Sequence, residues 1–377
     1  MSKVKLGEVA IEHKETCKGS KDGYPIVGLE HLVPEEVTLT AWDEGSDNTF
    51  TKMFRKGNVL FGRRRAYLKK AAVAPFDGIC SGDITVIEAI SDRILPELLP
   101  FIIQNDDLFD FAVGKSAGSL SPRVKWEHLK NYEFELPDMD KQRELAELLW
   151  AMDATKKSYQ KLIAATDELV KSQFMEQFGS YLGDETRCAT VEQVCTVFAD
   201  GDWIESKDQA DDGIRLIQTG NVGNGVYLDK GERARYIDEE TFIRLNCTEV
   251  LPNDILISRL PDPVGRACII PDGLGKSITA VDCSIVRLKS HVLPEFFVAY
   301  TMTTLYAAQI GSSVTGSTRK RISRKNLGQV VIPTPDIDQQ EQFAAFVRQS
   351  DKSKFELEQA LSELTATYKR IITENLG

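Results

Sequence analysis

The stretch LPDMDKQREL at residues 136–145 is followed 198 positions later by a near copy, TPDIDQQEQF at residues 334–343. In both copies an acidic turn that contains proline leads into a segment without proline. A turn of this kind before a proline-free run is typical of a helix start. The same start written twice indicates that the chain contains an internal repeat.

The repeat extends well beyond this stretch. SPRVKWEHLKNYEFELPDMDKQRELAEL at residues 121–148 aligns with RKRISRKNLGQVVIPTPDIDQQEQFAAF at residues 319–346. With small shifts, GNVLFGR at residues 57–63 also matches NDILISR at residues 253–259. A period of about 200 residues is too long for a solenoid unit, so the repeat predicts a duplicated domain.

The bulk composition is that of an ordinary soluble protein. The chain has 377 residues, of which 42% are hydrophobic and 27% are charged, and this length allows two or three domains with their own cores. No apolar run approaches the roughly 18 residues that a membrane span needs. The first segment, MSKVKLGEVAIEHKE, lacks the features of a signal peptide. We therefore expect no membrane partner and a cytoplasmic location.

The cysteines and histidines do not form a metal site in the sequence. Seven cysteines are present, an odd number, and no two of them form a C-x-x-C pair. The four histidines are scattered and have no His or Cys partner at ligand spacing. We expect buried free thiols and no bound metal.

Each repeat is expected to have a globular part and a helical part. The globular parts are predicted at residues 1–137 and 187–335, and the long helices at residues 138–180 and 336–377. The globular parts contain short β-branched runs between Gly, Asn, Asp and Pro turns. Such runs predict the strands VLFGR, ITVIEA, ILISR, ACIIP and CSIVRL.

Each globular part also contains one predicted helix. Residues 96–114 and 294–311 each begin with proline and end with glycine, as helices commonly do. The fold class expected for the globular parts is therefore mixed α/β, or α+β.

The long segments carry apolar residues at alternating steps of three and four, which predicts a coiled-coil seam with period 3.5. The predicted seam residues are Leu145, Leu148, Met152, Tyr159, Leu162 and Leu169 in the first segment and Phe343, Phe346, Leu357 and Leu364 in the second. Forty residues of helix would span about 60 Å, and such a helix must bury its apolar stripe. We expect the two helices to pair as an antiparallel coiled coil that separates two pseudo-two-fold-related domains. A helical hairpin that serves only oligomerisation is the alternative.

Basic residues gather at matching places in the two repeats. The net charge of −11 argues against a simple nucleic-acid binder, but local clusters decide how a surface binds phosphate. RRRAYLKK at residues 63–70 and RKRISRK at residues 319–325 are the densest clusters, and SPRVK at residues 121–125 is a weaker counterpart of the second. A solvated charged loop is the common explanation of a single cluster. Recurrence at equivalent loops favours DNA binding.

The predicted DNA-binding residues are Arg63, Arg64, Arg65, Lys69, Ser119, Arg123, Lys125, Arg259, Lys276, Ser317, Arg319, Lys320, Arg321, Arg324 and Lys325.

Catalytic motifs are missing from the sequence. PDGLGKS at residues 271–277 resembles a phosphate loop, but the first glycine of that motif would fall on Ile270. The sequence has no G-x-G-x-x-G, no G-x-S-x-G, no H-E-x-x-H and no Asn-Pro-Pro-aromatic motif. We predict no catalytic residue and no cofactor bound by this chain.

Over nearly its whole length, the chain resembles the specificity (S) subunits of type I restriction–modification enzymes. The resemblance is carried by the GNVLFGR and NDILISR strands, by the GS…PRVKWEHLKNYEFELP and GS…RKRISRKNLGQVVIPTP segments, and by the DMDKQRELAEL and DIDQQEQFAAF helix starts. One departure is that Gly62 stands where the second repeat has Ser258. GLGKS also has no clear counterpart in the first repeat.

The resemblance implies that each globular part is a target-recognition domain that reads half of a split, asymmetric DNA sequence. It implies that the long helices dock two modification (M) subunits, that restriction (R) subunits join them, and that the chain itself is not an enzyme. S-adenosylmethionine, ATP and Mg²⁺ would then be bound by the partner subunits. The competing hypotheses are a stand-alone DNA methyltransferase or nuclease with an unrecognised active site, and a coiled-coil scaffold without a DNA function.

Overall fold

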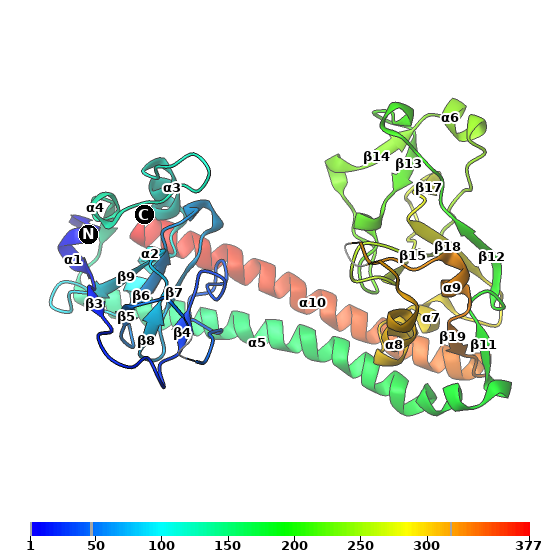
Figure 1. The fold of residues 1–377 in the computed structure, drawn as a ribbon, viewed down its shortest axis with the longest axis horizontal. Helices are drawn as coiled ribbons and strands as arrows, with labels where there is room; N and C mark the ends of the chain where they lie inside the picture. Colours follow the sequence, from blue (N-terminus) through cyan, green and yellow to red (C-terminus); the bar gives the residue numbers. More distant parts are fainter. Residues whose placement is uncertain (1, 46–47, 317–318) are drawn as a thin grey trace. The chain divides into compact units, whose positions relative to one another are not determined.

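The computed structural model describes residues 2–45, 48–316 and 319–377 (Figure 1). The chain divides into two compact units. Unit 1 comprises Met1–Lys161 with Glu358–Gly377, and unit 2 comprises Leu162–Leu357. Each unit therefore contains one globular part together with a portion of each long helix.

Unit 1 is built around a four-stranded antiparallel sheet with strand order β2-β9-β6-β7. Its strands are β2 Ala10–Glu12, β9 Ile84–Ala89, β6 Val59–Gly62 and β7 Ala71–Val73. Val59 and Phe61 point to one hydrophobic cluster, and Leu60 between them points to another. Both faces of the sheet are thus buried, which explains why VLFG is a continuous apolar run.

A second sheet and a strand pair complete unit 1. The second sheet has the order β3-β5-β8-β4, with β3 Glu15–Thr16, β5 Lys52–Phe54, β8 Gly78–Cys80 and β4 Ile26–Val27. The antiparallel pair is formed by β1 Ser2–Lys5 and β10 Glu133–Leu136.

Unit 2 repeats the plan of unit 1. Its main antiparallel sheet has the order β12-β18-β15-β16, with β12 Cys195–Asp200, β18 Cys283–Leu288, β15 Ile255–Ser258 and β16 Ala267–Ile269. The other strands are β14 Arg235–Ile237, β13 Ile214–Ile217, β17 Ser277–Thr279, β11 Cys188–Thr190 and β19 Val331–Pro333. The expected mixed and duplicated fold is confirmed, and so are the five predicted strands.

The helix expected at residues 96–114 is two helices, α2 Leu99–Ile103 and α3 Asp106–Gly114. The helix expected at residues 294–311 is likewise divided, into α7 Pro294–Thr301 and α8 Thr304–Ser313. The breaks have a common cause, because a polar side chain caps the second helix of each pair. Asn105 accepts a hydrogen bond from the amide of Asp107, and Thr303 accepts one from the amide of Tyr306.

The remaining helices of the globular parts are short. They are α1 Leu6–Val9, α4 Trp126–Leu129, α6 Glu239–Arg244 and α9 Arg324–Gly328. The 3₁₀ turns are η1 Ala66–Leu68, η2 Gly179–Gly183, η3 Glu185–Arg187, η4 Ser206–Asp208, η5 Thr219–Asn221 and η6 Gly231–Arg233.

Two helices of 40 residues, α5 Met139–Phe178 and α10 Ile337–Leu376, contribute to both units. In unit 1, Leu149 near the start of α5 shares a core with Ile372 near the end of α10. In unit 2, Phe174 near the end of α5 packs against Phe343 near the start of α10, with ring centroids 5.4 Å apart. The helices therefore run antiparallel, as expected. None of the described helices combines the length and the apolarity that a membrane crossing requires.

The predicted seam is wrong at three of its leucines. Leu148, Leu162 and Leu169 are 44%, 51% and 48% exposed. The buried positions of α5 follow a period near 3.6 instead: Gln142, Leu145, Ala146, Leu149, Met152, Asp153, Val170, Phe174 and Phe178. Leu148 already lies outside the buried face, one residue before the buried Leu149. A pattern of period 3.5 drifts by about 20° per heptad from a straight α-helix, which carries Leu162 and Leu169 farther from that face.

The other predicted seam residues lie in or beside the buried faces. Leu145, Met152 and Phe343 are buried. Tyr159, Phe346, Leu357 and Leu364 are partly buried.

A buried glutamine joins each long helix to its globular part. The side chain of Gln142 accepts a hydrogen bond from the amide of Leu95 and donates one to the carbonyl of Pro137. Gln340, its counterpart in the repeat, accepts from the amide of Leu293 and donates to the carbonyl of Pro335. Each amide thus satisfies backbone groups that would otherwise be buried without partners.

Adjacent leucines test the corrected helix face. Leu149→Ala should lower the free energy of unfolding of unit 1 by about 2–5 kcal/mol, because it opens a cavity in the core. Leu148→Ala, the matched control, should change it by less than about 0.5 kcal/mol. Urea unfolding can be followed by tryptophan fluorescence in a Trp203→Phe background, where the remaining tryptophans, Trp42, Trp126 and Trp150, all lie in unit 1. If both variants lost the same free energy of unfolding, the helix face with period 3.5 would be the buried one.

Candidate nucleic-acid interface

A closed loop lies at the same place in each unit. In unit 1 the backbones of Ala117 and Arg123 exchange hydrogen bonds of 3.0 and 2.9 Å. In unit 2 Thr315 and Arg321 make the same exchange, with both bonds at 2.9 Å. We name these segments the 117–123 loop and the 315–321 loop. In each segment these reciprocal bonds join the two ends, as at the base of a hairpin.

Glycine at the same position of each loop makes the turn possible. Gly118 has φ = 114° and Gly316 has φ = 95°, a region that favours glycine. A Cβ on Gly316 would lie 2.4 Å from the carbonyl oxygen of Arg319. The glycine repeated in the sequence therefore has a geometric cause.

Each loop is joined to the end of a central strand. The amide of Val124 donates to the carbonyl of Arg63, directly after β6, at 3.0 Å. The amide of Ile322 donates to the carbonyl of Arg259, directly after β15, at 3.2 Å. The strand end and the loop thus form one surface in each unit.

An aspartate gathers the arginines of unit 1. Arg123 donates from Nε and Nη2 to the two carboxylate oxygens of Asp83, at 2.7 and 3.2 Å. Nη1 of Arg64 lies 3.6 Å from the same carboxylate, and its Nε donates to Oγ of Ser121 at 2.5 Å. The Arg123 guanidinium holds the pKa of Asp83 below its usual value, so the aspartate stays ionised at neutral pH.

Unit 2 has a similar cluster built on a different acid. Asp200, at the end of β12, lies 3.3 Å from Nε of Arg259 and 3.5 Å from Nε of Arg324. Arg259 also donates from Nη2 to the carbonyl of Val281, at 2.5 Å. The guanidinium of Arg259 therefore binds groups inside unit 2, and we do not count it among the groups that contact DNA. Arg324 is exposed, and its Nη1 donates to the carbonyl of Phe198 at 2.9 Å.

An open groove of about 840 Å³ lies beside the Asp83 cluster of unit 1. It is lined by Glu12, Lys14, Glu15, Thr16, Thr49, Phe50, Thr51, Lys52, Arg63, Ser81, Gly82, Asp83 and Arg123. Nε of Arg63 is buried there without a hydrogen-bond partner. Hydroxyl groups beside guanidinium groups are the donors and acceptors that read base edges and phosphates. The groove thus brings two predicted residues, Arg63 and Arg123, to one site.

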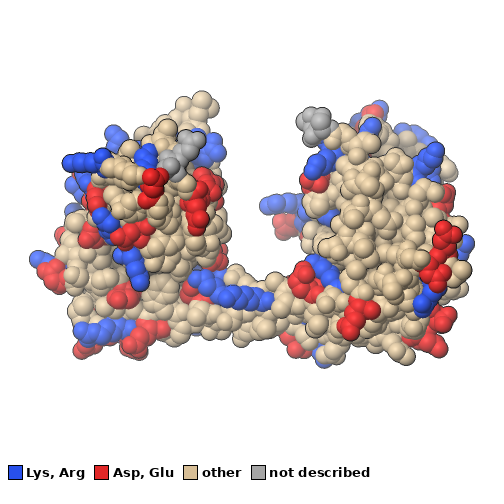
Figure 2. Space-filling view, turned by 60° about the horizontal axis from the view of Figure 1, so that its bottom comes forward, with Lys and Arg blue, Asp and Glu red and all other residues tan. Residues whose placement is uncertain are grey.

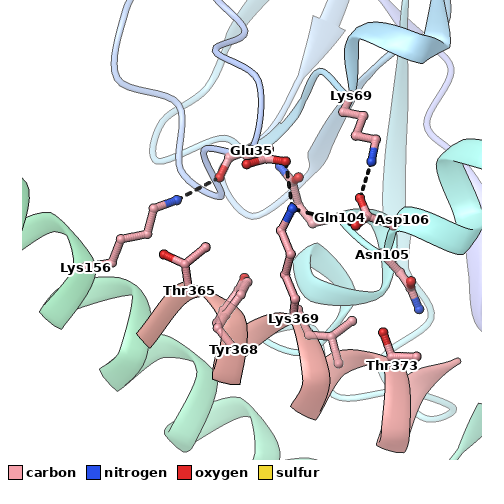
Figure 3. A pocket seen from close by; sticks show the side chains of 11 residues that line it. Glu35, Lys69, Gln104, Asn105, Asp106, Lys156, Thr365, Tyr368, Lys369 and Thr373 are labelled. Carbon is pink, nitrogen blue, oxygen red and sulfur yellow. Dashed lines mark hydrogen bonds and ion pairs between the residues drawn. The ribbon is translucent and has the colours of Figure 1, made fainter. Parts of the chain in front are cut away.

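Lys69 takes an internal role. Its Nζ donates to a carboxylate oxygen of Asp106 at 2.5 Å, and Lys369 of α10 lies 3.7 Å from the other oxygen. Figure 3 shows these groups around a small pocket, where Lys369 also donates to Glu35 at 2.9 Å. The network attaches α10 to the globular part of unit 1, so Lys69 is not included in the interface.

Lys276 also has partners inside its unit. It donates to Glu239 at 2.6 Å and lies 3.8 Å from the centroid of the Phe242 ring. The resemblance of GLGKS to a phosphate loop therefore has no structural counterpart here.

The other predicted residues lie at the surface. Arg65, Ser119, Lys125, Arg319, Lys320, Arg321 and Lys325 are exposed, and Ser317 lies outside the described residues. Lys320 is 3.3 Å from Asp262, an exposed ion pair that water screens. In Figure 2 the visible face of each unit carries Lys and Arg beside Asp and Glu. Any DNA contact on that face must therefore depend on positioned side chains rather than on a uniformly basic surface.

The two aspartates that hold the arginines, Asp83 and Asp200, were not among the predicted residues. Asp83 and Arg123 are 40 positions apart, and no spacing rule connects them. A signal for Asp83 exists, since GDITVI and VDCSIVRL align and place an aspartate before each strand. The amides of Arg63 and Arg259 donate to the carbonyls of Asp83 and Asp282, so the alignment reflects shared backbone geometry.

Most of the cysteine thiols are buried and free, as the sequence led us to expect. All seven cysteines are free, and five of them are buried. Burial raises the pKa of Cys80 and Cys268 to about 12, so these thiols stay protonated and are poor ligands.

One group among the described residues has the composition of a metal site: Glu30, His31 and Asp43, whose ligand atoms lie within 4.8 Å of one another. Nδ1 of His31 accepts a hydrogen bond from the amide of Gly28 at 2.9 Å. In neutral His31 the proton therefore resides on Nε2, facing Asp43. Metal binding through Nε2 would require the loss of that backbone bond.

Comparisons with known proteins agree with this architecture. A family model described as "Type I restriction modification DNA specificity domain" matches residues 1–165 and again residues 186–365. No curated protein matches the chain.

Solved structures share the fold. One, from "Structural basis underlying complex assembly and conformational transition of the type I R-M system", has 20% identity, a TM-score of 0.60 and coverage of 99% of this chain and 97% of that chain. Another, the S subunit of a type I restriction-modification system from M. genitalium, has 11% identity, a TM-score of 0.54 and coverage of 100% and 96%. Since the family model accounts for both halves of the repeat, the chain belongs to the type I restriction-modification DNA specificity family and is a DNA-recognition subunit.

Proposed function

We propose that each unit reads one half of a split DNA sequence through its closed loop and the adjoining strand end. The observation that carries this proposal is that the same pair of backbone hydrogen bonds closes the 117–123 loop and the 315–321 loop. Matching closing bonds hold the ends of the two loops in the same way, while different side chains select different bases. The two half-sites would therefore be unlike each other, and the target asymmetric.

In unit 1 the central groups of this interface are Arg64 and Arg123. Asp83 occupies Nε and Nη2 of Arg123, which leaves the Nη1 donors of that side chain for DNA. The aspartate also fixes the guanidinium in one orientation, which lowers the entropy lost when a base edge binds. In unit 2 the corresponding groups are Arg319, Lys320, Arg321 and Arg324.

The chain acts in this proposal as a scaffold for catalytic partners. Two modification subunits and restriction subunits would assemble on it, and they would bind S-adenosylmethionine, ATP and Mg²⁺. This chain would supply recognition and no catalytic group. Its place of work would be the cytoplasm, where such an assembly meets DNA.

Selection from random-sequence duplexes tests the proposal. The full chain, co-expressed and co-purified with a type I modification subunit of its host, should enrich two short unlike motifs separated by unread base pairs. Arg123→Ala should degrade one motif and Arg321→Ala the other. A single continuous motif, or the absence of any enriched motif, would refute the proposed function.

The basic residues of the 315–321 loop should also control the salt dependence of DNA binding. If Arg319 and Lys320 each contact a phosphate, Arg319→Glu with Lys320→Glu should reduce the slope of log K against log[salt] by about 1.8, at about 0.9 per contact. The control, Lys161→Glu with Lys352→Glu, makes the same charge change at exposed positions of α5 and α10. Equal slopes for the two double variants would place Arg319 and Lys320 away from DNA.

A further inference from the structure

The 117–123 loop presents a leucine to solvent. Leu120 is 91% exposed, the highest value among the large hydrophobic side chains that the structure describes. A single exposed apolar residue is common on protein surfaces and indicates nothing by itself. Its meaning depends on whether the backbone holds it in place and on what surrounds it.

Hydrogen bonds hold the chain on both sides of Leu120, through the backbone and through the side chain of Ser121. On one side, the loop is closed by the reciprocal bonds between Ala117 and Arg123. On the other, the hydroxyl of Ser121 accepts from Arg64, and the carbonyl of Pro122 accepts from the amide of Arg65 at 2.8 Å. These bonds present Leu120 outward at a defined position, as expected of a contact residue.

The surroundings of Leu120 are those of a DNA contact. Arg64 and Arg123 meet on Asp83 at the base of the loop. The 315–321 loop has the same closing bonds, but in its sequence the position that aligns with Leu120 is followed by Arg319 and Lys320. The 315–321 loop is therefore suited to phosphate, while the 117–123 loop carries an exposed leucine with two arginines at the base of the loop. A leucine on a loop with two arginines at its base is poorly suited to an apolar protein surface, because docking there would desolvate the arginines.

We propose that Leu120 makes an apolar contact with a thymine methyl group in the half-site that unit 1 reads. This inference rests on the proposed function and names a specificity-determining residue for it. The C5-methyl of thymine is the apolar group that the major groove displays, and apolar side chains recognise it by contact. Unit 1 thus reads part of its half-site without a hydrogen bond, whereas Arg319 and Lys320 of the 315–321 loop bind the DNA backbone.

The test uses the full chain co-purified with its modification subunit, and random-sequence duplexes as the probe. Leu120→Ser should no longer require a thymine at one position of one half-site, and the other half-site should be unchanged. Leu120→Met, which keeps an apolar side chain, should retain the preference. Val113→Ala removes another exposed apolar side chain of unit 1, in α3, and should leave both motifs unaltered.

Defined duplexes identify the chemical group. Deoxyuridine in place of that thymine removes only the methyl, and should weaken binding by the wild-type chain about fourfold, the factor for one methyl-sized apolar contact. The same replacement should have no effect on Leu120→Ser. The salt slope should be equal for the wild type and Leu120→Ser, because no phosphate contact is lost.

Three outcomes would overturn the inference while leaving the proposed function intact. Leu120→Ser could select the wild-type motif with equal affinity, lose affinity equally for every duplex, or keep the motif and lose the modification subunit. The last result would identify Leu120 as a protein contact. If the wild-type chain selects no split motif, the proposed function itself fails, and this result is distinct from the other three.

Discussion

Each unit completes its hydrophobic core with the end of a helix that begins in the other repeat. In unit 1, Ile372 and Leu376 of α10 are buried, and the carbonyl of Leu376 accepts a hydrogen bond from the side chain of Asn105 at 3.2 Å. In unit 2, Phe174 and Phe178 of α5 are buried in the core of the second globular part. The end of each helix cannot leave the core in which it is buried without exposing this apolar surface, which costs about 25 cal/mol per Å². The antiparallel pairing therefore follows from the packing of the two cores, and the exposed leucines of α5 are not needed for it.

The same duplication allows the two units to differ where they are expected to meet DNA. Strand ends, closing hydrogen bonds and loop glycines recur in both units, so the frame is common. The acids that hold the arginines do not recur as side chains, since Asp83 precedes β9 in unit 1 whereas Asp200 ends β12 in unit 2. Matching strand ends and loop closures with different side chains suit two readers of unlike preference, which is the requirement for an asymmetric split target.

The sequence predicted the duplicated mixed fold and the antiparallel pair of long helices, because strand alternation, helix starts and repeats are local or self-aligning signals. It did not predict the buried helix face, since apolar residues at steps of three and four fit periods of 3.5 and 3.6 over one or two turns. Gln142 and Gln340 align in the sequence, yet their buried hydrogen bonds depend on segments about 47 residues upstream. Asp83 was missed for the same reason, because its partner Arg123 is distant in the chain and is brought near only by the fold. Leu120 had no sequence signal at all, since exposure is a property of the folded loop.

Hydrogen exchange of the full chain tests most directly whether each core is completed by the end of a helix that begins in the other repeat. Ile372→Ala with Leu376→Ala, far from β6 and α2 in the sequence, removes buried side chains from the core of unit 1. Amides of Val59–Gly62 and Leu99–Ile103 should lose protection equivalent to several kcal/mol, at about 2–5 kcal/mol per truncated side chain. Amides of Ile255–Ser258 and Cys283–Leu288 in unit 2 should keep theirs, and Arg370→Ala, at an exposed position of the same helix, should change neither set. Unchanged protection in unit 1, or equal loss in both units, would contradict the account.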